Sequence, residues 1–311
     1  MGDMSDLPVY PFERTGEGPP DEYAEFRKES PLRKVRLRNG EEAWLATRYD
    51  DVRSLLADNR FSNNPAKDGY PQLSASRPVI SKTQDVPPFL WMDPPRHTHF
   101  RRTVTREFTY ARVQALKPLV DGVINGLIDK LIAHGPPADL VTEFALPVPT
   151  TVILHMLGVD YEEHQFFQDN ANRVIATDID PALQKQAQEA IRGRFLEIIK
   201  KKELDPAARD NIIGRLIEKQ IEPGEINHAE ACSILQSLVI AGHETTASMI
   251  ALGMMLILRD RAKFERLRDE SSPEMVGLMV EELLRYWSPV HFTGMRVATE
   301  DVEYGGVRLK A

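Results

Sequence analysis

The chain has 311 residues, of which 42% are hydrophobic and 28% charged, and its formal net charge is -8. This length allows one large domain or two small ones, and the acidic balance argues against a nucleic-acid-binding protein, which is usually basic. The single cysteine, Cys232, excludes an intrachain disulfide and a cysteine-cluster metal site. The first eight residues have neither a basic stretch nor an apolar core, so we expect no secretory signal, no membrane anchor and a cytoplasmic protein.

Along the chain the pattern is mostly helical, with a few short strands. Asn39-Gly40 lies between two strand-like segments, 35–38 and 43–46, and predicts the tight turn of a small hairpin. Residues 61–91 are rich in Pro, Ser and Asn with little periodicity, which predicts a long loop that could act as a lid. Helical periodicity between Gly and Pro breakers then predicts helices over 94–108, 112–133, 138–157, 162–177, 181–202 and 210–222.

The longest predicted helix contains the apolar run Ile234–Leu258. Asn227 and Glu230 have the spacing of a capping box, so the helix should begin there and extend for about 46 Å at 1.5 Å per residue. The run is long enough to cross a bilayer, but a central acidic residue such as Glu244 costs about 2.5–3.5 kcal/mol on insertion scales. We therefore predict a core helix and no membrane span.

Residues 241–246, Ala-Gly-His-Glu-Thr-Thr, interrupt this apolar helix in its middle. A charged or unpaired polar group is costly to bury, so we predict that this segment faces a cavity where chemistry happens. Gly242 exposes backbone, and Thr245 can donate a hydrogen bond to the carbonyl of Ala241, which tends to bend a helix. The alternative is that Thr245 only satisfies its own helix and Glu244 pairs with a distant arginine.

A second motif places His97 and Arg101 four residues apart, on one face of a helix. Asp93, followed by two prolines, predicts the cap and first turn of that helix. Two donor groups on one face suit a carboxylate ligand, which Arg can bind through two hydrogen bonds; a solvated basic helix face is the alternative. Arg102 and Arg106 form a second basic stripe on the same helix.

A third motif, Glu282-x-x-Arg285, places two opposite charges on one helix surface. Pro289 should end this helix. Two strands are then predicted, over 292–298 and over 302–309 around a Gly-Gly turn, and the first of them carries Arg296.

These three motifs, in this order, resemble the cytochrome P-450 haem-thiolate monooxygenases of the soluble bacterial type. The resemblance covers nearly the whole chain and implies a mainly α fold with small β-sheet elements, in one P-450 domain over residues 1–311. It also implies that Glu244 and Thr245 relay protons so that the O–O bond of dioxygen breaks, beside an oxygen groove lined by Ala241 and Gly242.

The resemblance implies the remaining roles as well. His97, Arg101 and Arg296 would contact the haem propionates, and Glu282 and Arg285 would hold the core beneath the haem through a buried ion network. The activity implied is insertion of one oxygen atom of dioxygen into an apolar small-molecule substrate, bound between the central helix, residues 61–91 and residues 166–190. Electrons would come from NAD(P)H through a reductase and a ferredoxin-type donor, and we hypothesise that Arg102 and Arg106 dock this acidic partner.

One feature departs from the family, whose haem iron is bound by a cysteine in a loop well past the Glu-x-x-Arg helix. The sequence ends at Ala311 without such a loop, and Cys232 lies about 20 Å before Thr245 on the same helix and roughly 220° around it, so we predict only a packing role for it. We therefore expect a C-terminally truncated, inactive form of a monooxygenase or, alternatively, a non-catalytic ligand-binding or partner module with that fold.

His243-Glu244 could also belong to the active site of a zinc peptidase. Its helix motif needs a second histidine four residues after the first, and that position holds Ala247. His97 and His99 are a weak metal pair, because alternate residues diverge on a helix. The sequence therefore predicts no metal site formed by side chains of these 311 residues.

Overall fold

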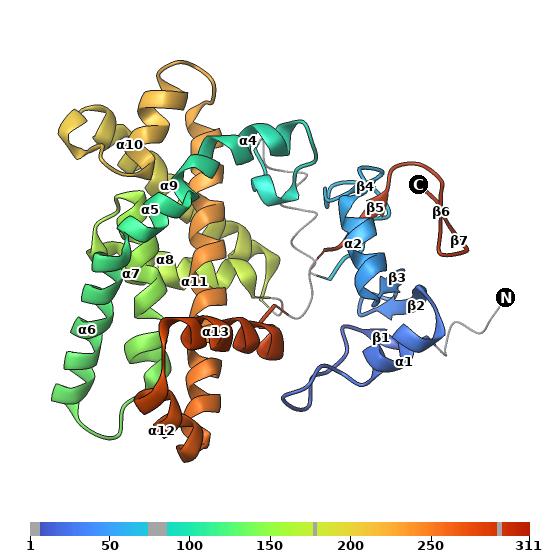
Figure 1. Ribbon diagram of the computed structural model, residues 1–311. Coiled ribbons are helices and arrows are strands. Elements are labelled where there is room, and N and C mark those ends of the chain that lie inside the picture. The colour runs from blue at the N-terminus through green and yellow to red at the C-terminus, as the bar shows by residue number, and fades with distance from the viewer. Residues whose placement is uncertain (1–6, 74–85, 177–178, 291–293) are drawn as a thin grey trace. The chain divides into compact units, whose positions relative to one another are not determined.

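The computed structural model describes residues 7–73, 86–176, 179–290 and 294–311. They form two compact units, one drawn from residues 1–95 and 291–311 and the other from residues 96–290. The described strands all belong to the first unit, whereas the second is helical (Figure 1). This confirms the prediction of a mainly α protein with small β-sheet elements.

The first unit is built on the predicted hairpin. Strand β2 (Leu32–Leu37) pairs antiparallel with β3 (Glu42–Ala46), and β1 (Val9–Tyr10) adds to β2 in parallel. The turn differs from the prediction, because Gly40 alone of the Asn-Gly pair has a positive φ, 88°. The preceding residues therefore keep ordinary φ values and one glycine closes the turn.

The rest of this unit consists of two helices that were not predicted, a 3-10 turn and four short strands: α1 (Glu22–Glu29), α2 (Tyr49–Ala57), β4 (Phe61–Ser62), η1 (Phe89–Trp91), β5 (Val297–Ala298), β6 (Val302–Tyr304) and β7 (Val307–Leu309). Strand β4 pairs with β5, and β6 with β7. The predicted loop over 61–91 thus begins in a strand and ends in a 3-10 turn; its residues 74–85 lie outside the described part.

The strand predicted over 292–298 is shorter in the structure. Only Val297 and Ala298 pair with a neighbour, while Gly294 has a φ of 74°, which extended β structure does not use. Residues 291–293 lie outside the described residues. The strand predicted over 302–309 forms as the β6–β7 hairpin, with Gly305 and Gly306 at its turn.

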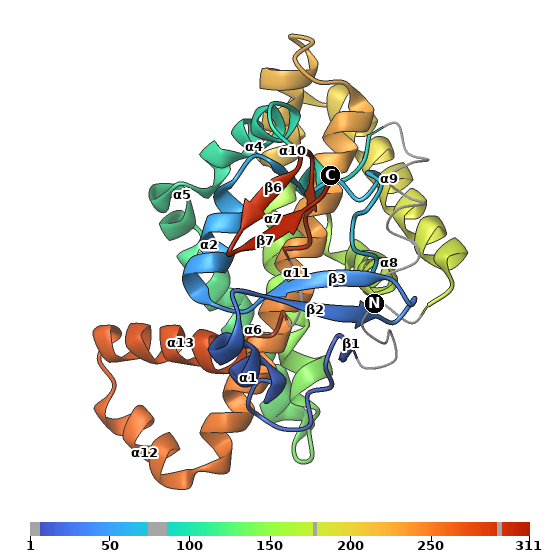
Figure 2. The same cartoon turned by 90° about the vertical axis from the view of Figure 1, so that its right-hand side faces the viewer.

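The second unit consists of the following helical elements: α4 (Arg96–Thr105), η2 (Arg106–Phe108), α5 (Tyr110–Ala115), α6 (Lys117–His134), η3 (Val141–Ala145), α7 (Pro147–Leu157), η4 (Tyr161–Glu163), α8 (His164–Ile175), α9 (Pro181–Glu203), η5 (Pro206–Ala208), α10 (Ile212–Leu216), η6 (Ile217–Ile221), α11 (His228–Arg259), α12 (Arg261–Glu270) and α13 (Pro273–Trp287). Helix α11 runs through this unit, and α7, α8 and α9 pack against it (Figures 1 and 2).

Helix α11 begins as predicted. The Asn227 side chain accepts a hydrogen bond from the Glu230 amide at 3.0 Å, and the Glu230 carboxylate accepts one from the Asn227 amide at 3.0 Å. Residues 231–237 are all buried, and burial on every side of two successive turns is expected for a core helix. By length and composition α11 could also cross a membrane, and 17% of its apolar window is buried; the burial of residues 231–237 supports the predicted core role for the first turns of the helix.

Several of the predicted helices are divided in the structure, among them those over 112–133 and 138–157. A break at Leu116 separates α5 from α6, and a π-helical turn, η3, precedes α7. Pro118 and Pro147 lie in the first turns of α6 and α7. Proline has no amide hydrogen to donate, so it is tolerated at a helix start and not in the interior.

Candidate active site

His243 is the buried residue of the polar segment in α11. Its Nδ1 lies 2.7 Å from the hydroxyl of Thr150 on α7. That hydroxyl donates its hydrogen to the Leu146 carbonyl at 2.7 Å, so it can only accept from His243, which places the imidazole hydrogen on Nδ1. Among the described residues Nε2 is buried without a partner. The segment therefore directs His243 into the α7–α11 interface, which the sequence did not indicate.

Burial lowers the pKa of the His243 imidazole below its ordinary value of 6.5, and the nearby Glu244 carboxylate partly offsets this. The unfolded chain therefore binds a proton more readily than the folded chain, and the free energy of unfolding should fall as pH drops below about 6.5. We expect His243→Asn, which keeps a donor for Thr150, to show a weaker pH dependence.

Urea denaturation of both proteins between about pH 7.5 and 5 would measure this difference. Every other titrating group is common to the two proteins, so the difference between their profiles isolates His243. Parallel profiles would contradict the expected depression of the pKa.

Thr245 behaves as predicted from the sequence, since its hydroxyl donates to the Ala241 carbonyl at 2.8 Å. The Glu244 carboxylate accepts from Ser248 at 3.4 Å and, within the described residues, is not paired with an arginine. A Cβ added at Gly242 would lie 3.5 Å from the Ile153 side chain of α7. Gly242 and the His243 side chain thus lie toward α7, and Glu244 and Thr245 occupy the next two positions of the helix.

Helix α4 carries the second motif. Phe100 and Val104 form its buried face, while His97 is half-buried and Arg101 exposed. The predicted cap is wrong, because α4 begins at Arg96 and Asp93 lies three residues before it, outside the position that caps a helix. The Asp93 carboxylate instead accepts hydrogen bonds from the Ser62 hydroxyl and from the Asn63 amide.

Arg296 lies in the first unit, whereas His97 and Arg101 lie in the second. Its Nη1 donates to the Asn63 side chain and to the Met295 carbonyl, both at 2.8 Å. Burial lowers the pKa of the Arg296 guanidinium, and the neighbouring Tyr70 and Asp93 offset part of this effect. A half-buried cation of this kind suits a carboxylate ligand, but its grouping with the α4 residues stays a prediction.

Glu282 and Arg285 form the predicted ion pair on α13. Arg285 donates from Nε and Nη2 to the two carboxylate oxygens, both at 2.7 Å, and these bonds lower the pKa of Glu282. The expected burial is not found, since the side chains are 61% and 70% exposed. Leu283 is the residue directed at α11, toward Gly253, which leaves the charged pair on another side of α13.

A family model described as Cytochrome P450 matches residues 11–311. The chain belongs to the cytochrome P450 family. It is 39% identical over 310 residues to the vitamin D3 dihydroxylase of Streptomyces griseolus, covering 99% of this chain and 74% of that protein. Cytochrome P450 GfsF of Streptomyces halstedii is 40% identical over 309 residues, with coverages of 98% and 73%.

Solved structures agree with this assignment. The mycinamicin VIII C21 methyl hydroxylase MycCI of Micromonospora griseorubida, bound to mycinamicin VIII, matches with a TM-score of 0.87 and 32% identity, over 98% of this chain and 76% of that chain. The predicted cytochrome P450 fold is thereby confirmed. Haem is the cofactor of this monooxygenase family, with NAD(P)H as the indirect electron source.

The residues present suit only part of a haem. His97 and Arg101 on α4, and Arg296 in the first unit, each offer hydrogen-bond donors that a carboxylate can accept. Cys232 does not suit the axial position, because it is buried and burial raises the pKa of its thiol to about 11, which disfavours the thiolate. It also lies thirteen residues before Thr245 on the same continuous helix, a rise of about 20 Å. The packing role predicted for Cys232 fits this environment.

Proposed function

We propose that this sequence belongs to a haem-dependent monooxygenase that inserts one oxygen atom of dioxygen into an apolar small-molecule substrate. The observation that carries the proposal is the Ala241–Thr245 hydrogen bond on α11, with the Glu244 carboxylate beside it, in a chain of the cytochrome P450 family. Bound haem supplies the iron centre at which dioxygen is activated. The two units would then form the single domain expected from the sequence.

In this proposal Glu244 and Thr245 relay protons to the oxygen being reduced. A carboxylate exchanges protons with water, and a hydroxyl can accept one proton while donating another, so the pair can transfer protons over a short distance. Ala241 and Gly242, whose side chains are small or absent, would line the oxygen groove. The test is to replace Glu244 and Thr245 together and to measure how much product forms for each dioxygen consumed.

His97, Arg101 and Arg296 are proposed to hold the haem propionates. Each offers hydrogen-bond donors, and an arginine can bind a carboxylate with two of them. Glu282 and Arg285 are proposed to have a structural role, since their charges already satisfy each other. Haem affinity that is unchanged in Arg101→Gln would reject the assignment of that arginine.

The substrate is proposed to lie between α11, residues 61–91 and residues 166–190. Helices α8 and α9 pack against each other and against α11, so two of these three regions adjoin within the helical unit. Relatives of this chain are named for hydroxylation of vitamin D3 and of a mycinamicin methyl group, which supports an organic substrate with large apolar parts. The test is to add apolar small molecules to the haem-bound protein and to record the haem absorption spectrum; a change in the spectrum would support binding in this region.

Electrons are proposed to arrive from NAD(P)H through a reductase and a ferredoxin-type donor, in the cytoplasm. Arg102 and Arg106 are cations that could dock such an acidic donor. The test is to reverse both charges and to measure the reduction rate as a function of salt. Salt screens exposed charges, so the rate of the unmodified protein should fall as salt is added, and the variant should show a lower rate with a weaker salt dependence.

The 311 residues alone are proposed not to supply the axial thiolate, and so to be inactive as a monooxygenase. The experiment is to express this polypeptide, add haem, reduce it and record the carbon monoxide difference spectrum. We expect no thiolate-type Soret band. A thiolate-type band that disappears in Cys232→Ser would show that Cys232 is the ligand and would contradict the proposal. The alternative, a non-catalytic ligand-binding or partner module, would bind apolar compounds without needing Glu244 or Thr245.

A further inference from the structure

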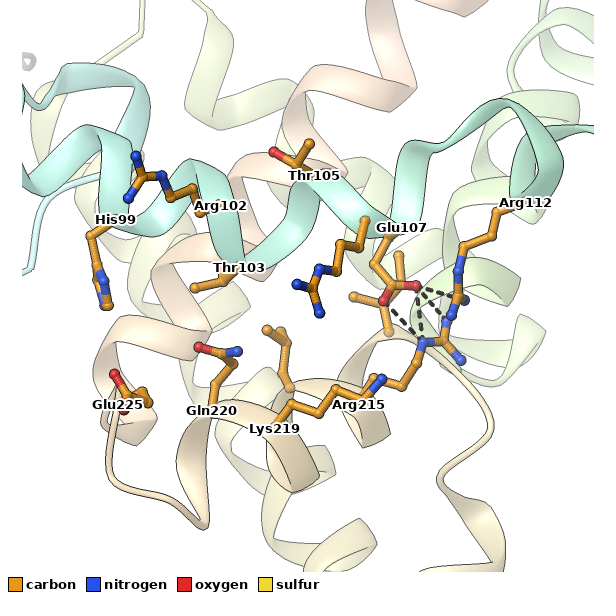
Figure 3. A pocket seen from close by; sticks show the side chains of 13 residues that line it. His99, Arg102, Thr103, Thr105, Glu107, Arg112, Arg215, Lys219, Gln220 and Glu225 are labelled. Atoms are coloured by element: carbon orange, nitrogen blue, oxygen red, sulfur yellow. Dashed lines mark hydrogen bonds and ion pairs between the residues drawn. The ribbon is translucent and has the colours of Figure 1, made fainter.

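A cavity of about 770 Å³ lies within the helical unit, away from the α11 polar segment, between α4 and the α10–η6 segment. Figure 3 shows the side chains of α4 on one wall and Lys219 and Gln220 on the other. Its lining includes five arginine or lysine side chains and a histidine against two glutamates: Arg102, Arg106, Arg112, Arg215, Lys219, His99, Glu107 and Glu225. The pocket is therefore cationic although the chain is acidic overall.

One of the two glutamates is already neutralised. Glu107 is buried, and Arg215 donates to its two oxygens at 2.9 and 3.1 Å from Nε and at 2.7 Å from Nη2. Arg112 is the second guanidinium group on this carboxylate, at 3.0 Å. Arg215 also contacts the Asp210 carboxylate at 3.3 Å from Nη1, so two guanidinium groups and two carboxylates balance here. The contacts with Glu107 fix α10 against the segment that follows α4.

In the view of Figure 3 the other glutamate, Glu225, is drawn at the end of the hollow away from Arg112, as is His99. Between the two ends, Arg102 and Arg106 come from one wall and Lys219 from the other. None of these three forms an ion pair or hydrogen bond with its side chain in the part of the chain that is described. All three are exposed; cations that line one hollow without ion pairs of their own repel one another, and a bound anion would relieve this repulsion.

We propose that this pocket binds a small phosphate-bearing anion. Phosphate groups are the ligands that clustered arginine and lysine side chains recognise, since guanidinium groups fit the oxygens in pairs and ammonium groups add point charge. The volume lies within the usual range of small-ligand sites, about 300–1,000 Å³. Cations on both walls of the hollow can contact a small anion from two sides. None of the residues assigned to haem or to the proton relay takes part; Arg102 and Arg106 are the residues proposed above to dock an electron donor, so a bound anion would compete with that partner for them.

The experiment is calorimetric titration of the 311-residue chain with inorganic pyrophosphate at constant ionic strength, so that screening does not change during the titration. We expect saturable binding at one site, and at least a tenfold weaker affinity in the Arg106→Gln, Lys219→Gln double variant. The matched control is Arg173→Gln, Lys130→Gln, which removes the same charges from exposed helix positions outside the pocket. This control should bind pyrophosphate like the unmodified chain.

Three outcomes would overturn the proposal. Absence of saturable binding would show that the cations are only solvated, and equal weakening in both double variants would show a general charge effect. Tighter binding of hexaglutamate than of pyrophosphate, lost in the Arg106→Gln, Lys219→Gln variant, would assign the pocket to an acidic protein partner instead. None of these readouts needs haem, so they are independent of the proposed monooxygenase function.

Discussion

Gly214→Ala is expected to lower the free energy of unfolding of the helical unit by about 3 kcal/mol or more. A Cβ at this position would lie 2.0 Å from the carbonyl oxygen of Arg209 and 2.4 Å from its Cα. Both are backbone atoms, so rotation of a side chain cannot relieve the overlap, and either α10 or the turn before it must move. The Gly214 amide also donates to the Asn211 side chain at 3.0 Å, so the same movement would break the cap of α10.

Gly193→Ala on α9 is the matched control, because a Cβ there meets no atom within 4 Å. In the interior of a helix alanine is favoured over glycine by about 1 kcal/mol, so this variant should be slightly more stable than the unmodified chain. Thermal or urea denaturation of the three proteins would measure both effects. A Gly214→Ala protein as stable as the unmodified chain would contradict the contact between Arg209 and α10.

The same substitution also bears on the cationic pocket. Helix α10 carries Arg215, whose guanidinium binds the buried Glu107. A displaced α10 should separate this pair, and a buried carboxylate that loses its partner is costly. The geometry at this end of the pocket therefore depends on a close backbone contact as well as on charge.

The sequence predicted those features that depend on neighbouring residues. The start of α11 follows from a capping box, and the end of α13 at Trp287 from Pro289 two residues later. The hydrogen bond from Thr245 to Ala241 spans one helical turn and was predicted for the same reason. Each of these signals is contained in a few consecutive residues.

Contacts between distant segments left no such signal. Thr150 and His243 are 93 residues apart, and Glu107 and Arg215 are 108 apart. Helix α12 was missed for another reason, since its sequence lacks an apolar stripe and its side chains pair locally, as Arg261 does with Glu265. The burial expected for Glu282 and Arg285 came from the family resemblance, whereas in the structure Leu283 faces α11.

The direction of each side chain in the α11 segment also required the structure. Successive residues of an α-helix point about 100° apart, so His243, Glu244 and Thr245 cannot share one environment. Contact with Thr150 fixes His243 toward α7, and this places the acid and the alcohol on other sides of the helix. The prediction that the whole polar segment faces one cavity is therefore wrong for His243. Glu244 and Thr245 lie outside the interface with α7, so their proposed roles are compatible with this arrangement.

Replacing Glu244 by Gln and Thr245 by Ala together is expected to uncouple oxygen consumption from product formation in a haem-bound, thiolate-ligated form of the protein. Positioned proton transfer typically contributes about 100-fold or more to a rate, so product formed per dioxygen consumed should fall at least about tenfold, with hydrogen peroxide accumulating instead. Folding should be little affected, because the Thr245 hydroxyl only bonds to its own helix and alanine is the better helix former. The control is the single variant Thr245→Ser, which leaves Glu244 unchanged and keeps a hydroxyl at position 245, so its product formed per dioxygen consumed should stay close to that of the unmodified protein. An unchanged ratio in the double variant would reject the relay.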